Sequence, residues 1–182
     1  MERVAVLIDG SNLFFKLREL GIRQGTIEFR YDKLCDFLAR DRQVVSRVYY
    51  VGAVKVFNND PKAMKLRKQQ QRLFANLEKQ NISVQRGYLM GNNGKFHEKG
   101  VDVKIATDLL IGAYENLFDV AILISSDTDL IPAIKQVKIL GKAIEYIGFA
   151  QSPSFGLQKN VTLSRLLIRD EIDKFIAILN VV

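Results

Sequence analysis

The sequence has few of the residues that build disulfides, zinc sites or catalytic triads, and it has no membrane-length apolar run. Cys35 is the only cysteine among 182 residues, which excludes an intramolecular disulfide and suits a reducing cytoplasm. His97 is the only histidine, which argues against a zinc site built from histidines and against a Ser-His-Asp triad. No apolar run approaches the roughly 20 residues that span a bilayer. A glycine-rich phosphate loop of the Walker or dinucleotide type is also missing.

What is present is the composition of a folded, basic protein. Hydrophobic residues make up 48% of the chain and charged residues 26%, as in soluble globular proteins. A strand-like run begins within three residues of the N-terminus, leaving no room for a signal peptide, so we expect a cytoplasmic protein that does not use the membrane. The net charge of +7 suits a polyanionic partner, although a basic surface kept for solubility explains it as well.

Strand-like and helix-like segments alternate along the chain. This alternation predicts an α/β fold: a three-layer α/β/α sandwich with a mainly parallel central sheet of about five strands. We expect residues 1–182 to form one domain, with 160–182 as C-terminal closing helices. Ser11 or Asn12 is expected to cap the first helix. The strands are expected at residues 4–8, 47–54, 82–86, 120–124 and 143–147.

A hairpin is expected between the third strand and the next helix. Tyr88-Leu89-Met90 and Lys95-Phe96-His97 flank Asn92-Asn93-Gly94, and Asn-Gly is the strongest short hairpin signal. The second arm leads into Lys99-Gly100-Val101-Asp102, so the hairpin is expected to stand beside the functional cleft.

Four aspartates follow the ends of strand-like runs or open a helix. Asp9 ends the first run, Asp127 and Asp129 follow the fourth, and Asp102 opens a helix. In open parallel sheets the functional crevice lies at the carboxyl ends of the strands. Four carboxylates gathered there repel one another, and a hard cation such as Mg²⁺ or Mn²⁺ removes that repulsion. For any single aspartate, a turn or helix-cap role is the alternative; for the set we favour a metal site.

Three motifs in this order carry a family resemblance: Asp9-Gly10-Ser11-Asn12, Lys99-Gly100-Val101-Asp102 and Ser125-Ser126-Asp127-Thr128-Asp129. They resemble the NYN domains of the PIN-like nuclease superfamily, specifically the LabA-like branch, from about Val4 to Gly148. The resemblance implies metal-dependent RNA cleavage on a parallel α/β sheet.

The resemblance also implies roles for individual residues. Asp9, Asp102, Asp127 and Asp129 would hold the metal as catalytic residues, with Asn12 beside them. Asn12 either orients Asp9, contacts the scissile phosphate or only caps its helix. Further candidates near the metal or the substrate are Ser125, Lys99, Lys104 and Asp108. The two lysines either contact phosphate or pair with a carboxylate; Asp108 lies about 240° around the helix from Asp102, on another face.

RNA contacts are expected from two places. The longest predicted helix carries Lys62, Lys65 and Arg72 on its polar side, where they either contact phosphate or form a solvated face. On the hairpin, Tyr88 is placed to stack on a base and Lys95 to contact the backbone.

The leading interpretation is a metal-dependent ribonuclease that acts on single-stranded or structured RNA. The alternative is a PIN-like RNA-binding or regulatory module with little catalysis. Toprim domains and haloacid dehalogenase phosphatases share an Asp-x-Asp motif. Both are disfavoured, because Toprim domains have a glutamate where this chain has Asp9, and the phosphatases place Asp-x-Asp after the first strand. A homodimer is left open, since the apolar stretch Phe175–Leu179 suits an interface or a core helix equally.

Overall fold

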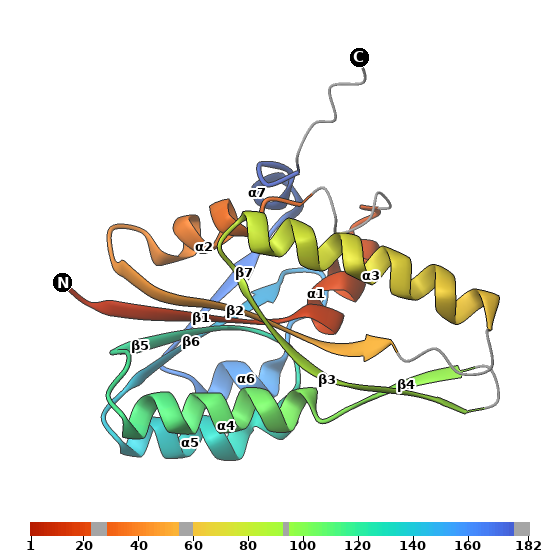
Figure 1. The fold of residues 1–182 in the computed structure, drawn as a ribbon. Coiled ribbons are helices and arrows are strands. Elements are labelled where there is room, and N and C mark those ends of the chain that lie inside the picture. Colours follow the sequence, from red (N-terminus) through yellow and green to blue (C-terminus); the bar gives the residue numbers. More distant parts are fainter. Residues whose placement is uncertain (23–28, 55–59, 93–94, 177–182) are drawn as a thin grey trace.

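A seven-stranded sheet forms the centre of the computed structural model, which describes residues 1–22, 29–54, 60–92 and 95–176 (Figure 1). Within these ranges the side chains of residues 88–92 and 95–98 are not described. The strands lie in the order β4-β3-β2-β1-β5-β6-β7; six are parallel, and β4 runs antiparallel to β3. They are β1 (Arg3–Asp9), β2 (Gln43–Val54), β3 (Ser83–Asn92), β4 (Lys95–Lys99), β5 (Val120–Ile124), β6 (Ala143–Phe149) and β7 (Leu163–Leu167).

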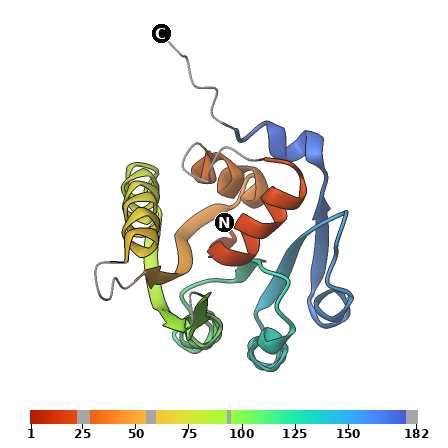
Figure 2. The same cartoon turned by 90° about the vertical axis from the view of Figure 1, so that its right-hand side faces the viewer.

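Helices cover both faces of the sheet, so the predicted α/β/α sandwich with a mainly parallel sheet is confirmed. Figures 1 and 2 show α1, α2, α3 and α7 on one face and α4, α5 and α6 on the other. None of the helices in the described ranges is long and apolar enough to cross a membrane. They are α1 (Gly10–Glu19), α2 (Tyr31–Ala39), α3 (Pro61–Lys79), α4 (Val101–Tyr114), the 3₁₀ turn η2 (Thr128–Leu130), α5 (Ile131–Ile139), α6 (Phe155–Asn160) and α7 (Arg169–Asp173).

Strand β1 lies in the middle of the sheet, and its side chains alternate between two cores. Val4, Val6 and Ile8 pack with buried residues of α1, α2 and α3. Ala5 and Leu7 face the other way, into the core formed with α4, α5 and α6. Because both faces are covered, the strand reads as an unbroken apolar run and not as an alternating one.

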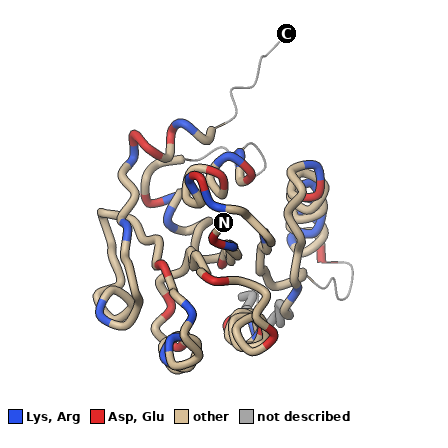
Figure 3. The backbone as a smooth tube through the Cα atoms, turned by 90° about the vertical axis from the view of Figure 1, so that its left-hand side faces the viewer, with Lys and Arg blue, Asp and Glu red and all other residues tan. Residues whose placement is uncertain are grey.

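The parallel arrangement gives the sheet two different edges. We call the side where the six parallel strands end the carboxyl edge, and the side where they begin the amino edge. β1, β5 and β6 all finish at the carboxyl edge, which faces the viewer in Figure 2. Figure 3 shows the opposite side, the amino edge.

The predicted hairpin is confirmed as the β3–β4 pair. Its antiparallel register runs from Tyr88 opposite Lys99 to Asn92 opposite Lys95, and its tip, residues 93–94, lies outside the described residues. The strand expected at 82–86 and the first hairpin arm form a single strand, β3. Its first part pairs with β2 and its last part with β4. The second arm is therefore an additional edge strand of the sheet.

The prediction that residues 160–182 form closing helices is wrong for residues 163–167. Leu163–Leu167 forms β7, a parallel edge strand beside β6, and the following helix spans only Arg169–Asp173. Leu167 packs in the core under α1 and α2, whereas Leu166 packs in the opposite core. Pairing with β6 and burial on alternate faces outweigh the helix propensity of these residues.

The apolar C-terminal stretch is partly assigned to the core. Phe175 is 5% exposed and packs against the rings of Phe29 and Phe37. Ile176 forms an antiparallel bridge with Phe29. Residues 177–179 lie outside the described residues, so a dimer interface there stays a prediction.

Cys35 is fully buried on α2 within the same core. Burial raises the pKa of its thiol to about 12, so the thiolate needed for a nucleophile is disfavoured. Cys35 is therefore a structural residue of this core.

Candidate metal centre at the carboxyl edge

Asp9 is the last residue of β1 and also the N-cap of α1. Its Oδ1 accepts the backbone N–H of Asn12 at 3.0 Å, and its Oδ2 accepts the hydroxyl of Ser125 at 2.9 Å. Asp9 as a whole is 8% exposed. The cap is therefore Asp9, and the prediction that Ser11 or Asn12 caps this helix is wrong. Asn12 helps to orient Asp9 through its main chain.

The turn after Asp9 has no room for a side chain at Gly10. A Cβ at this position would overlap the ring of Tyr49, which lies on β2. The Tyr49 hydroxyl donates to the Gly10 carbonyl oxygen at 3.2 Å. Tyr49 thus packs against the turn and fixes its backbone through this hydrogen bond. The sequence carries no sign of this role, since it arises only when β1 and β2 pair in parallel.

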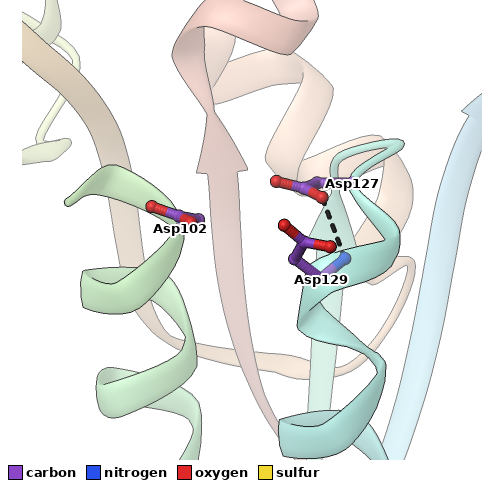
Figure 4. Close-up of side chains that lie close together, drawn as sticks. All are labelled: Asp102, Asp127 and Asp129. Atoms are coloured by element: carbon purple, nitrogen blue, oxygen red, sulfur yellow. Dashed lines mark hydrogen bonds between the residues drawn. The ribbon is translucent and has the colours of Figure 1, made fainter. Parts of the chain in front are cut away.

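Ser125 connects Asp9 to the acidic turn that follows β5. Its hydroxyl oxygen donates to Asp9 and accepts the backbone N–H of Asp127 at 3.1 Å. Asp127 in turn caps η2, because its Oδ1 accepts the backbone N–H of Asp129 at 2.9 Å (Figure 4). One chain of hydrogen bonds therefore runs from the end of β1 to the start of η2.

Asp102, Asp127 and Asp129 form the acid centre. One carboxylate oxygen from each lies within 4.8 Å of the others. Asp102 comes from the first turn of α4, after Gly100 with φ 77°, and the other two come from the turn after β5 (Figure 4). Asp102 and Asp127 are half-buried, and Asp129 is exposed. Within the described part of the chain, no lysine or arginine forms a salt bridge with any of the three.

The structure thus brings three of the four predicted carboxylates together and holds the fourth beside them. Asp9 is not part of the group within 4.8 Å, and it reaches Asp127 through Ser125. Three neighbouring carboxylates repel one another when no cation neutralises them. Oxygen-only ligands of this kind suit a hard divalent cation.

Lys104 and Asp108 lie away from the acid centre and pair with each other. Lys104 Nζ is 3.1 Å from Asp108 Oδ1, and the Tyr50 hydroxyl donates to Asp108 Oδ2 at 3.0 Å. Burial, with the charge of Asp108 adding to it, raises the pKa of Tyr50. Tyr50 and Asp108 line a separate cavity of about 390 Å³ between β2 and α4. Of the two alternatives for Lys104, the structure shows the pairing with a carboxylate.

The remaining predicted residues lie outside the acid centre. Lys99 is exposed at the end of β4. Lys62, Lys65 and Arg72 are exposed on α3. The side chains of Tyr88 and Lys95, proposed for RNA contact, are outside the described part of the structure.

The family model for the NYN domain matches residues 3–177, which is nearly the whole chain. The chain belongs to the NYN domain family. This confirms the resemblance to PIN-like nucleases, whereas the LabA-like branch stays a prediction.

A solved structure shares the fold of this NYN domain. It is a protein of unknown function, VPA0982, from Vibrio parahaemolyticus, with 24% identity and a TM-score of 0.69. The alignment covers 96% of each chain. No curated protein matches the sequence.

Proposed function

We propose that this NYN domain is a metal-dependent ribonuclease that uses Mg²⁺ or Mn²⁺. The observation that carries the proposal is the convergence of Asp102, Asp127 and Asp129 without a paired cation at the carboxyl edge, in a chain that belongs to a nuclease family. When bound, such a cation supplies an activated water and neutralises charge on the phosphate oxygens.

The three carboxylates fit a small divalent cation. Two ligand oxygens on opposite sides of a Mg²⁺ ion, each at 2.0–2.1 Å, are about 4.2 Å apart. The oxygens of the acid centre lie within 4.8 Å of one another, so a small movement of the exposed Asp129 is enough to close the site. Asp9 keeps one rigid carboxylate beside them, where it orients the turn through Ser125. A role for Asp9 in accepting a proton or in contacting the metal is part of the proposal.

Helix α3 supports a polyanionic substrate such as RNA. It carries six cations and one acid, and the cations are spread from its first turn to its last. Those cations are Lys62, Lys65, Arg67, Lys68, Arg72 and Lys79, and none belongs to an ion pair among the described residues. The helix begins near the carboxyl edge (Figure 1), so Lys62 and Lys65 in its first two turns can guide a phosphate backbone toward the acid centre.

The test is cleavage of labelled RNA and DNA by the pure protein, with EDTA, Mg²⁺ or Mn²⁺. We expect metal-dependent cleavage of RNA that Asp9→Asn abolishes, while RNA affinity stays equal or rises because a negative charge is lost near phosphate. RNA binding without cleavage in either metal would overturn the proposal. It would favour the alternative function, an RNA-binding module with little catalysis.

A further inference from the structure

The cavity of about 390 Å³ between β2 and α4 is a second concave site in this protein, and we call it the β2–α4 cavity. None of the three carboxylates of the acid centre lines it. A cavity of about 150 Å³ is large enough to hold benzene, so the β2–α4 cavity has room for a compound of two rings. Its volume lies within the roughly 300–1,000 Å³ that is usual for small-molecule sites.

The β2–α4 cavity forms where the sheet is narrow. β3 joins β2 only from Val48 onward, opposite Ser83, so among the described residues the preceding part of β2, residues 43–47, pairs with β1 alone. On the helix side the cavity is lined by Gly112, and a Cβ at this position would lie 2.5 Å from the ring of Phe118. The short neighbouring strand and the glycine leave a volume that the described side chains do not fill.

Most of the residues that line the β2–α4 cavity are apolar. The sheet contributes Ala5 and Leu7 of β1. Three further lining residues are exposed hydrophobics: Val45 by 41%, Ile111 by 45% and Leu117 by 53%. Water beside such walls has few hydrogen-bond partners, so an apolar ligand that displaces it gains binding free energy.

The polar groups of Tyr50 and Asp108 in the cavity are hydrogen-bond acceptors. The Tyr50 hydroxyl donates its one proton to Asp108 Oδ2 at 3.0 Å, which leaves the hydroxyl oxygen as an acceptor. Asp108 Oδ1 accepts Lys104 Nζ at 3.1 Å. A carboxylate has about four acceptor sites, so about two remain on Asp108 beyond these contacts. A ligand that offers a donor group therefore matches these oxygens.

The charge of the lining selects against anions. Asp108 is the only charged residue among the described residues that line the cavity, and its partner Lys104 is not one of them. A molecule in the cavity thus meets the carboxylate of the pair and not its ammonium group. An anionic ligand would be repelled there, whereas an ammonium group brings both an opposite charge and hydrogen-bond donors.

We infer that the β2–α4 cavity binds a small amine, an apolar compound of about two rings that carries one ammonium group. The rings lie against Ala5, Leu7 and the exposed apolar residues, and the ammonium group donates to Asp108 and Tyr50. The inference does not rest on the proposed function, because the cavity shares no residue with the acid centre.

The experiment is a titration of the isotope-labelled full chain, without metal, followed by NMR. The probe is tryptamine, and the matched compound is indole-3-propionate, which has the same rings and a carboxylate in place of the ammonium group. We expect tryptamine to bind with a Kd of about 1 mM or below, as its size allows, and to shift the amide signals of residues 45–50 and 108–118. Indole-3-propionate should bind at least about 10-fold more weakly.

Two variants connect the binding to the cavity. Ser46 lines the cavity at an exposed position of β2, so Ser46→Phe should place a ring in it and abolish tryptamine binding without unfolding the protein. The matched control is Ser164→Phe, at an exposed position of the edge strand β7, which should leave binding unchanged. Asp108→Asn keeps an acceptor but removes the charge, and it should weaken tryptamine binding by roughly 5- to 10-fold.

Several results would overturn the inference. These are no shifts at about 10 mM tryptamine, ten times the expected Kd, equal affinity for the two compounds, or an unchanged Kd in Ser46→Phe. If the shifts are confined to residue 102 and residues 125–129, tryptamine acts only as a counter-ion of the acid centre, and the inference fails. RNA cleavage, or its absence, bears on the proposed function alone.

Discussion

Both edges of the sheet carry carboxylates, but the two sets differ in whether they pair with Lys or Arg among the described residues. At the amino edge, Asp119 accepts hydrogen bonds from the guanidinium and backbone of Arg3, and Lys142 lies 3.6 Å away. The Arg3 hydrogen bonds hold the pKa of Asp119 well below its usual range. At the carboxyl edge, Asp102, Asp127 and Asp129 meet with no such partner among the described residues.

On the proposed function, the difference separates a structural carboxylate, Asp119, from carboxylates that bind a metal. The charge of Asp119 is balanced within the protein, so the amino edge is complete as it stands. Among the described residues the acid centre has no paired cation of this kind, and a site that binds a metal is expected to have this property. The following changes test whether this contrast governs activity and stability.

Exchange of one carboxylate at each edge should have the largest effect. Asp127→Asn should reduce metal-dependent RNA cleavage by more than about 100-fold. Loss of a residue that only hydrogen-bonds to a metal ligand costs roughly 10–100-fold, and Asp127 is a proposed ligand itself. Asp119→Asn should leave cleavage within a few-fold of wild type. Melting without metal is the control: Asp127→Asn should be as stable as wild type or more so, because repulsion falls and Asn also caps a helix. Equal loss of activity in both variants would break the comparison.

Reversal of three cations on α3 should have the next largest effect. Lys62→Glu, Lys65→Glu and Arg72→Glu together should flatten the salt dependence of single-strand binding by about two units of slope, roughly 100-fold in affinity at 0.1 M salt. The matched control reverses Lys33, Lys79 and Lys159, three exposed lysines outside the first turns of α3. Both triple variants have a net charge of +1, since three reversals subtract six from +7. Equal effects would show that only net charge matters.

Ser125→Ala should have a moderate effect. The hydroxyl joins Asp9 to the turn of Asp127, and its loss should lower apparent metal affinity about 10–100-fold with little effect on RNA affinity. Mn²⁺ titration of cleavage measures this shift, and Ser125→Thr, which keeps the hydroxyl, should retain more affinity than the alanine variant. Unchanged metal dependence in Ser125→Ala would mean that Asp9 is positioned by its helix cap alone.

The smallest effect concerns pH. Because the folded-state pKa of Asp119 is depressed, its stabilising contribution is present above the unfolded-state value and is lost as the pH falls through the folded value. Wild type should therefore exceed Asp119→Asn in melting temperature at neutral pH, and the gap should narrow below about pH 4. The comparison is made without metal, where the acid centre is the same in both proteins. A gap that is constant with pH would exclude the ion pair as its cause.

The sequence predicts the site better than it predicts the sheet's outer strands. Asp9 and Asp127 end apolar runs, and parallel pairing of β1 with β5 brings such ends together, so their proximity follows from pattern and topology. The part played by Ser125 does not follow, because the direction of its hydroxyl depends on register, with Ile8 opposite Ile124. β7 was missed because its residues favour a helix until β6 offers a pairing edge.

Asp108 is another residue whose partners the sequence predicts only in part. Its helical position correctly excludes it from the face of Asp102. Its actual partners, Tyr50 and Lys104, could not both be named, because Tyr50 reaches it only when α4 lies across β2. Spacing along one helix therefore excludes contacts between residues on different faces, but it does not identify the contacts that a residue makes with other elements.

The central place of β1 has a consequence for the nascent chain. Asp9 and its partner Ser125 are 116 residues apart, so at about 5–20 residues per second the ribosome makes Ser125 roughly 6–23 s after Asp9. Asp102, Asp127 and Asp129 are also late, and β5 must emerge and insert beside β1 before the turn that carries the last two can form. On the proposed function, an incomplete chain holds Asp9 but has no means of cutting RNA. On that proposal, the nascent chain gains its complete acid centre only after residue 129 has been made.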